Sequence, residues 1–379
     1  MRVLHTSDWH LGRSFHREDL LGAQAAFVDW LVDVVQAEQV DAVLVSGDVY
    51  DRALPSVDAV SLCNEALARL SRAGTRVVLI SGNHDSARRL GFGAELIDAA
   101  GVHLRTDPAA VGVPVVLEDE HGPVSVFGIP YLEPEAVRAE LGCDGHSHAA
   151  VVAAAMERVR AGLAAAPRRS VVLAHAFVAG GAASESEREI SVGGTALVPA
   201  EAFAGVTYTA LGHLHGPQEM APGVRYSGSP LAMSFSEEHH RKSVSLVELD
   251  AHGLARVEPL ACPVPRPLAR VRGRLDDLLT DARWSPYEQH FLQVTLTDPQ
   301  RPREPMERLR ARYPHVLVLG FEPEGVPADA RSYAVRLAGR SDLEVGLDFV
   351  EHVRGPAEPD EQAVLTRAFE AVRLVEAAR

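Results

Sequence analysis

Cysteine and long apolar segments are scarce in this chain of 379 residues. Only three cysteines occur and none belongs to a Cys-x-x-Cys pair, so neither a disulfide framework nor a structural zinc site is supported. No apolar run approaches the roughly 18 residues that a transmembrane helix needs, and residues 1–7 show no secretory leader. We therefore expect a cytoplasmic protein in which Cys63, Cys143 and Cys262 are small buried side chains.

Positive charge is also in short supply. Lysine and arginine number 37 against 52 aspartate and glutamate residues, which gives a formal net charge of −15. Because contacts of Lys and Arg with phosphate supply most non-specific affinity for nucleic acids, this balance argues against a free-standing DNA-binding protein. It does not exclude a nuclease, since bound divalent cations would balance some carboxylates and a partner subunit could supply a basic surface.

Length and proline distribution predict more than one domain. A chain of 379 residues exceeds one average domain. Residues 262–267 (CPVPRP) place three prolines in six positions, which favours an extended linker. We expect a catalytic domain over 1–262, a small α+β domain over 263–338 and a helical segment over 339–379.

Apolar runs alternate with helical patterns along the first 262 residues. This alternation is typical of an α/β fold, here a two-layer sheet sandwich flanked by helices. We expect strands at 3–6, 42–46, 77–81, 124–129, 170–174, 206–211, 224–226 and 243–249, and helices at 24–36 and 57–72. Beyond the linker we expect strands at 268–273, 290–297 and 316–319, a helix at 305–313, and terminal helices at 343–353 and 360–375.

Side chains that can bind metal ions follow five of these strands, in the segments SDWHLG, GDVYD, GNHD, LAHAF and GHLHG. In an open α/β sheet the carboxyl ends of the strands border the crevice where ligands bind, so residues far apart in the chain can converge there. The candidates are Asp8, His10, Asp48, Asn83, His84, His175, His213 and His215.

The types and number of these residues predict two metal ions. Carboxylate, carboxamide and imidazole ligands together suit Mn²⁺, Fe²⁺ or Zn²⁺ better than Ca²⁺ or Mg²⁺. A single catalytic zinc needs only three protein ligands, and more than twice as many candidates are present. Two ions about 4 Å apart can generate a hydroxide at neutral pH and stabilise the attacking and leaving oxygens. Asp48 is the natural bridge between them.

Glycines support the same interpretation, and most other histidines do not bear on it. Gly47, Gly82 and Gly212 stand where a strand must turn sharply, and glycine permits positive φ and close approach of the backbone. A lone D-x-H or H-x-H pair means little in a chain with 17 histidines. The histidines without strand context are interpreted as solvated; these are His146, His148, His239 and His240.

The five blocks in this order, D-x-H, GD, GNHD, H and GHxH, resemble those of the calcineurin-like metallophosphoesterases. Within that class, residues 1–12 (MRVLHTSDWHLG), 185–194 (ESEREISVGG) and 226–238 (YSGSPLAMSFSEE) resemble the SbcD family of bacterial DNA nuclease subunits. The resemblance implies one ion held by Asp8, His10, Asp48 and His215, and a second held by Asp48, Asn83, His175 and His213.

The resemblance assigns other roles around the metal ions. The family's histidine at position 84 contacts the scissile phosphate and assists the leaving oxygen, which makes His84 catalytic. Asp85 would orient the ring of His84 or cap the following helix, and both roles stay open. Basic side chains on the nearby loops would contact DNA phosphates or merely be solvated; these are Arg13, His16, Arg17, Arg52, Arg88 and Arg89.

An activity and partners are implied as well. The family's nucleases use Mn²⁺, degrade double-stranded DNA from 3′ ends, and cut single strands and hairpins during DNA repair, recombination and replication. A homodimer would assemble with an SbcC-type, SMC-like ATPase into a two-plus-two complex on nucleoid DNA. Residues 263–338 would then form a capping domain that helps hold DNA, and residues 339–379 would dock on the coiled coil of the ATPase.

Two rival functions share parts of this pattern. A cyclic-nucleotide or small-molecule phosphodiesterase would have the same metal site, but would not need the additional domain and helices beyond residue 262. A non-enzymatic scaffold that only binds DNA ends or the ATPase would be expected to have lost at least one site residue, whereas every expected ligand and His84 are present.

Overall fold

The computed structural model describes residues 1–164, 169–187, 197–324 and 341–377. The chain forms two compact units. The first contains Met1–Val271, Asp281–Val294 and Met306–Val318, and the second contains Arg272–Thr280, Thr295–Pro305 and Leu319–Arg379. Residues 188–194 of the second SbcD-like segment and the expected boundary at residue 338 lie outside the described residues.

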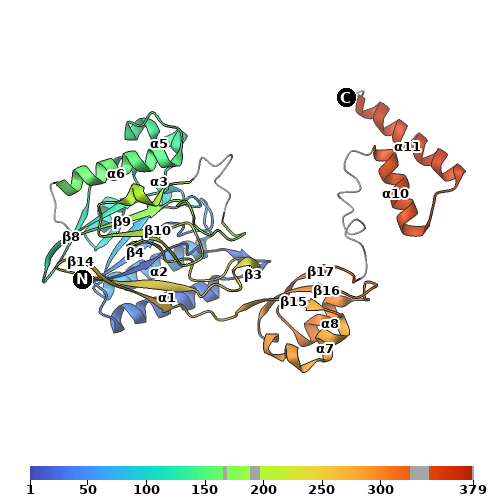
Figure 1. Ribbon diagram of the computed structural model, residues 1–379, viewed down its shortest axis with the longest axis horizontal. Coiled ribbons are helices and arrows are strands. Elements are labelled where there is room, and N and C mark those ends of the chain that lie inside the picture. The colour runs from blue at the N-terminus through green and yellow to red at the C-terminus, as the bar shows by residue number, and fades with distance from the viewer. Residues whose placement is uncertain (165–168, 188–196, 325–340, 378–379) are drawn as a thin grey trace. The chain divides into compact units, whose positions relative to one another are not determined.

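The first sheet of the first unit carries three of the five metal-binding segments (Figure 1). Its strands are β1 (Arg2–Thr6), β4 (Ala42–Ser46), β5 (Arg76–Ile80), β6 (Val102–Leu104), β13 (Ser243–Asp250) and β14 (Gly253–Ala261). They are ordered β14-β13-β1-β4-β5-β6, and β1, β4, β5 and β6 run parallel. The carboxyl ends of β1, β4 and β5 therefore meet at one edge of this sheet.

The second sheet carries the other two segments. Its strands are β7 (Val115–Asp119), β8 (Gly122–Ile129), β9 (Ser170–His175), β10 (Tyr208–Gly212), β11 (Gln218–Ala221) and β12 (Val224–Tyr226). They are ordered β11-β12-β10-β9-β8-β7, and β8, β9, β10 and β12 run parallel. The neighbouring strands β9 and β10 thus end side by side.

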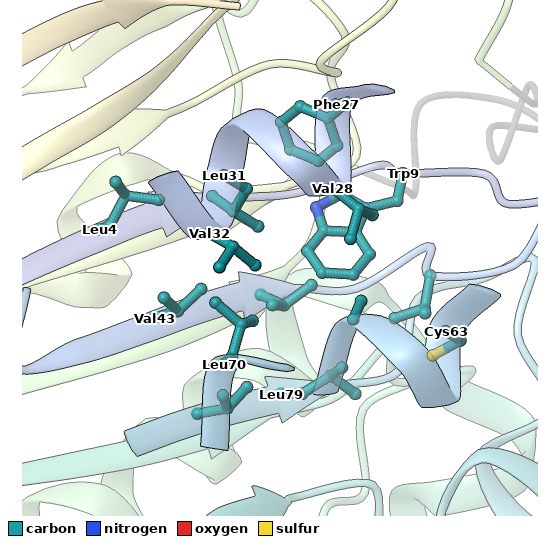
Figure 2. Packing of buried hydrophobic residues seen from close by; sticks show 14 of the residues in the cluster. Leu4, Trp9, Phe27, Val28, Leu31, Val32, Val43, Cys63, Leu70 and Leu79 are labelled. Carbon is teal, nitrogen blue, oxygen red and sulfur yellow. The ribbon is translucent and has the colours of Figure 1, made fainter. Parts of the chain in front are cut away.

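Both faces of each sheet are buried, which explains why the central strands read as continuous apolar runs. In β4, Leu44 belongs to the apolar layer between the two sheets, whereas Val43 faces helices α1 (Leu21–Ala37) and α2 (Val57–Arg72). Figure 2 shows this outer layer, with Leu31 of α1 and Leu70 of α2 packed over the strands.

Two further helices cover the second sheet. Side chains of α5 (Pro134–Leu141) and α6 (His148–Ala164) pack in one apolar cluster with residues of β8 and β9. The result is two stacked sheets with helices on both outer faces, which confirms the predicted fold class. Cys63 and Cys262 are buried as expected, and Cys143 is partly exposed.

Several elements were not anticipated from the sequence. Pro259 lies in β14, where it is tolerated because β14 is the outermost strand of its sheet. Helix α6 buries Val151, Ala155 and Val159 on one side, but alanines such as exposed Ala153 also occupy its other side, so its helical pattern is weak in the sequence. The other additions are β2 (Ser14–Phe15), β3 (Glu18–Asp19), β6, β7, β11, α3 (Ala87–Leu90), α4 (Ala94–Asp98), α5 and the 3₁₀ turns Pro108–Ala110, Ala200–Phe203, Phe235–Glu237 and Ala282–Tyr287.

The expected element order beyond the linker is confirmed, with one additional α-helix and the 3₁₀ turn Ala282–Tyr287. A three-stranded sheet has the order β15-β16-β17, with β15 at Leu268–Gly273, β16 at Phe291–Leu296 and β17 at Val316–Phe321. Helix α8 (Pro305–Arg312) was expected, whereas α7 (Leu275–Thr280) was not. The terminal helices are α10 (Asp342–Arg354), which opens with a capping box between Ser341 and Glu344, and α11 (Pro359–Ala377). Among the described residues, no helix is long and apolar enough to cross a bilayer.

Candidate metal centre

All the predicted metal ligands converge where parallel strands of the two sheets reach their carboxyl ends. Asp8 and His10 follow β1, Asp48 follows β4, and Asn83 follows β5. On the second sheet, His175 closes β9, and two histidines follow β10. The carboxylates and imidazoles among these ligands are buried: Asp8, His10, Asp48, His175, His213 and His215.

One group of ligand atoms gathers around His10. Its Nε2 lies 3.2 Å from Nε2 of His215, and single ligand atoms of Asp8, His10 and His215 all lie within 4.8 Å of one another. Two imidazole nitrogens and a carboxylate oxygen at this separation can share one cation. These are three of the four residues expected around the first ion.

A second group gathers around His175. Its Nε2 lies 2.9 Å from Oδ1 of Asn83, which in turn lies 3.3 Å from Nδ1 of His213. Oδ2 of Asp48 is 3.6 Å from Nε2 of His175 and also 3.6 Å from Nε2 of His10. Asp48 therefore stands between the two groups, as a bridging carboxylate must.

The backbone is strained where it presents these ligands. Four of them have a positive φ although none is glycine, a conformation that costs of order 1–3 kcal/mol and persists where the surroundings enforce it. The angles are 54° at Asp8, 45° at His10, 49° at Asp48 and 112° at His213.

The three predicted glycines are needed for two different reasons. Gly47 has a φ of +87°, a backbone angle that residues with a side chain rarely adopt. A Cβ atom at Gly82 would lie 2.1 Å from Oδ1 of Asp48, and one at Gly212 would lie 1.8 Å from the carbonyl oxygen of Ser46. The strands approach so closely here that no larger residue fits.

Burial sets the charge state of the ligands. It lowers the pKa of His10 and of His213 well below the ordinary value, so both imidazoles are neutral and have a lone pair available for a metal ion. Burial also raises the pKa of Asp8 to about 6. A cation beside Asp8 would favour its ionised form. Imidazoles, carboxylates and a carboxamide packed this closely are a donor set that fits divalent transition-metal ions.

His84 lies at the rim of the ligand set, and Asp85 does not orient its ring. Nδ1 of His84 lies 2.9 Å from the carbonyl oxygen of Asp51 and donates to it. The carboxylate of Asp85 instead accepts the main-chain N–H groups of Gly82, Val49 and Tyr50 at 2.9–3.1 Å. Helix α3 is capped from Ser86, without a side-chain bond. Asp85 thus joins the loops after β4 and β5, which neither expected role anticipated.

The candidate DNA-contacting residues fall into two kinds. Arg13 donates to the carboxylate of Asp51 at 3.3 Å and to the carbonyl oxygen of Ser186 at 3.4 Å. These bonds hold its side chain against the protein beside the metal ligands. Arg89 is exposed but donates to the carbonyl oxygen of Ala53 at 2.9 Å. The remaining members of the set are exposed: His16, Arg17, Arg52 and Arg88.

Two histidines interpreted as solvated are partly buried. The ring of His148, at the start of α6, lies 5.6 Å from that of Tyr131, and burial lowers its pKa. His240 packs its ring against Gly216. The interpretation is wrong for these two because each is covered by residues distant in sequence. It is right for His146 and His239, which are exposed.

Four polar residues behind His215 were missed. Ser186 and Glu237 lie at its Nδ1, Glu187 accepts its main-chain N–H at 2.8 Å, and Lys242 donates to its carbonyl oxygen at 3.0 Å. Three of them belong to the two segments that resemble the SbcD family, 185–194 and 226–238, which was the available signal. No spacing rule connects such residues to a histidine far away in the chain.

Known proteins match both parts of the chain. Residues 1–217 match the calcineurin-like phosphoesterase family, and residues 264–354 match the type 5 capsule protein repressor C-terminal domain. The D subunits of nuclease SbcCD from Escherichia coli strain K12 and from E. coli O157:H7 are each 34% identical over 288 residues, covering 73% of this chain and 72% of the relative. The structure of TT1561 of Thermus thermophilus shares 16% identity and a TM-score of 0.40, covering 69% of this chain and 98% of that chain.

Proposed function

The chain belongs to the calcineurin-like phosphoesterase family, and from this premise we propose that it is the nuclease subunit of a DNA-processing complex. Membership indicates a phosphodiester-hydrolysing enzyme, and the relatives that match most of the chain are nuclease subunits. The observation that carries the proposal is the convergence of every expected ligand at one buried centre next to His84. A scaffold without activity would have no need of this complete set.

Two divalent cations are the proposed cofactors, with Mn²⁺ as the metal. Asp8, His10 and His215 would hold one cation, Asn83, His175 and His213 the other, and Asp48 both. Bound there, the cations would supply Lewis-acid stabilisation of the phosphate charge and would activate a water molecule. The mixed nitrogen and oxygen donors favour a transition-metal ion over Mg²⁺.

His84 is the proposed proton donor to the leaving oxygen. Because its Nδ1–H is engaged by the carbonyl oxygen of Asp51, any proton it exchanges with substrate is carried on Nε2. That atom lies 4.0 Å from Oδ2 of Asp48 and so faces the ligand set. A protonated Nε2 can contact the phosphate and then assist departure of the leaving oxygen.

The proposed DNA activities are exonuclease action from 3′ ends of double strands and endonuclease action on single strands and hairpins, in DNA end processing and repair. Residues 263–338 would cap the DNA over the centre. With a net charge of −15, the chain gains from a partner that supplies basic surface. We propose an SbcC-type ATPase for this role, which accords with the name of the complex to which the E. coli relatives belong.

Helices α10 and α11 are the proposed docking element for that ATPase. The two helices pair with each other, yet Phe349 of α10 and Val364 of α11 keep more than half of their side-chain surface exposed. Apolar side chains exposed on a helical pair favour contact with another helix. The coiled coil of an SMC-like ATPase would provide such a surface.

The proposal is tested by Mn²⁺-dependent cleavage of an end-labelled hairpin duplex beside bis-p-nitrophenyl phosphate, with and without the ATPase. Hairpin cleavage that is lost in the His84→Gln variant would establish the nuclease. Hydrolysis of the small diester without any DNA cleavage, even with the ATPase present, would leave the metal centre in place and favour the rival small-molecule phosphodiesterase.

A further inference from the structure

The imidazoles of the metal centre differ in the hydrogen-bond partner of their Nδ1 atom. Nδ1 of His175 donates to a main-chain carbonyl oxygen, that of Ser46, at 2.9 Å. Nδ1 of His215 instead faces two side chains, with Ser186 Oγ at 2.6 Å and Glu237 Oε1 at 3.4 Å. His215 is therefore a ligand whose support can be removed by substitution.

Ser186, Glu237 and Lys242 form a directional chain of hydrogen bonds. Oγ of Ser186 lies 2.5 Å from Oε1 of Glu237 and, because a carboxylate only accepts, donates its proton there. A lone pair of Ser186 is then the acceptor for Nδ1–H of His215. Lys242 pairs with the other oxygen of Glu237 and donates to Ser229 Oγ at 2.9 Å, which fixes the carboxylate from behind.

The direction of this chain determines which nitrogen of His215 is free. Because Nδ1 holds its proton in the bond to Ser186, Nε2 is the nitrogen left to bind a metal ion, and it lies 3.2 Å from Nε2 of His10. We propose that Glu237 is a positioning residue that, held by Lys242 and acting through Ser186, fixes the tautomer and ring direction of His215 for metal binding. This inference rests on the proposed two-cation centre.

The burial of the Glu237–Lys242 pair supports a role beyond stability. Both side chains are almost completely buried. Removing such charges from water costs several kcal/mol per ion, and apolar residues of similar volume often stabilise a fold equally well. A charged carboxylate behind a metal-binding histidine makes that histidine a stronger ligand, which apolar residues cannot do.

Site-resolved Mn²⁺ titration by calorimetry and electron paramagnetic resonance tests the inference. Ser186→Ala and Glu237→Gln should each weaken one of two Mn²⁺ sites by about 10- to 100-fold and leave the other unchanged. Activity on bis-p-nitrophenyl phosphate should return towards the wild-type kcat as Mn²⁺ is raised. Glu238→Gln is the matched control, because Glu238 faces away and accepts the main-chain N–H of Arg270.

A double variant separates loss of metal affinity from loss of folding. Glu237→Gln leaves the charge of Lys242 buried without its partner, whereas Glu237→Gln with Lys242→Met removes both charges and should fold, as judged by circular dichroism and thermal melting. Folded variants that keep both Mn²⁺ sites at wild-type affinity, or that lose both equally, would overturn the inference. A wild-type protein that binds two Mn²⁺ ions but never cleaves DNA would refute the nuclease and leave this inference standing.

Discussion

The carboxylate of Asp48, which lies between the two groups of candidate ligands, also holds the main chain of His84. Oδ1 of Asp48 accepts the main-chain N–H of His84 at 2.8 Å, while Oδ2 faces the imidazoles of His10 and His175. The residue proposed to bridge both cations thus also places the proposed proton donor. Loss of Asp48 should therefore disturb metal binding and catalysis together, whereas loss of His84 should disturb catalysis alone.

Asp48→Ala should empty the metal centre. The substitution removes the oxygen that faces both ligand groups and also the carboxylate oxygen that accepts the main-chain N–H of His84. We expect stoichiometric Mn²⁺ binding to be lost and phosphodiester hydrolysis to fall about 1,000-fold or more, equivalent to about 4 kcal/mol of barrier. Metal analysis of the purified variant checks this, with exposed Asp144→Ala as control. Retention of two bound ions would contradict the bridging role.

His84→Gln should separate binding from chemistry. Glutamine can still donate to the carbonyl oxygen of Asp51 but cannot deliver a proton from an imidazolium. We expect both Mn²⁺ sites and DNA affinity to be kept while kcat falls by about 10²–10⁴-fold, the usual contribution of a general acid. The matched control is His146→Gln, whose side chain is exposed. If His84→Gln loses a metal ion, the residue is a ligand and its proposed role is wrong.

Asp85→Ala should destabilise the fold because the loops after β4 and β5 lose their shared acceptor, and it should leave the ring of His84 in place. The carboxylate of Asp85 accepts three main-chain N–H groups, and each buried donor left without a partner costs about 1–3 kcal/mol. We expect a clearly lower melting temperature, with Asp85→Asn intermediate because it retains one acceptor oxygen. An unchanged melting temperature with reduced kcat would instead support the ring-orienting role.

The centre was visible in the sequence because its residues follow strand ends, and strand ends are marked by local signals. Gly82 and Asn83 adjoin an apolar run, so their place at the sheet edge follows from neighbours in sequence. Glu237 and Glu238, by contrast, are adjacent residues of the same type. One is buried behind His215 and the other bonds the main chain of Arg270. Packing between segments distant in sequence determines which of the two glutamates is buried, so neighbouring residues in the sequence do not predict it.

Buried His5 should make the fold sensitive to mild acid. Nδ1 of His5 lies 2.9 Å from the hydroxyl of Tyr208, and its Nε2 lies 3.0 Å from the carbonyl oxygen of Leu211. Burial lowers the pKa of His5 to about 3, against 6.5 for the exposed side chain. Between these values the unfolded chain binds a proton that the folded chain does not, so stability falls as the pH drops below about 6.5.

His5→Gln should remove this contribution. We expect the free energy of unfolding, measured with urea in the presence of a chelator, to decrease less steeply between pH 6.5 and 5 in the variant. The difference in slope should approach 1.4 kcal/mol per pH unit, the value for one proton. Identical slopes in variant and wild type would show that other buried groups account for the acid sensitivity.

Substitution of exposed apolar residues should break the homodimer that the resemblance implies. Leu54, just before α2, and Val57, its first residue, expose 70% and 81% of their surface. Phe92, between α3 and α4, and Leu96, within α4, expose 87% and 84%. The hydrogen bond from Arg89 to the carbonyl oxygen of Ala53 joins the two segments that carry these side chains. Apolar side chains this exposed favour burial against a second copy.

We expect Phe92→Glu combined with Leu96→Glu to convert a dimer into a monomer in light scattering coupled to size-exclusion chromatography. Hydrolysis of bis-p-nitrophenyl phosphate should be unchanged, because neither residue contacts the ligand groups. Val116→Glu is the control, since Val116 is an exposed apolar residue on the edge strand of the second sheet. A wild-type protein that is monomeric at micromolar concentration would refute the homodimer. The same apolar surface would then be available to a different partner.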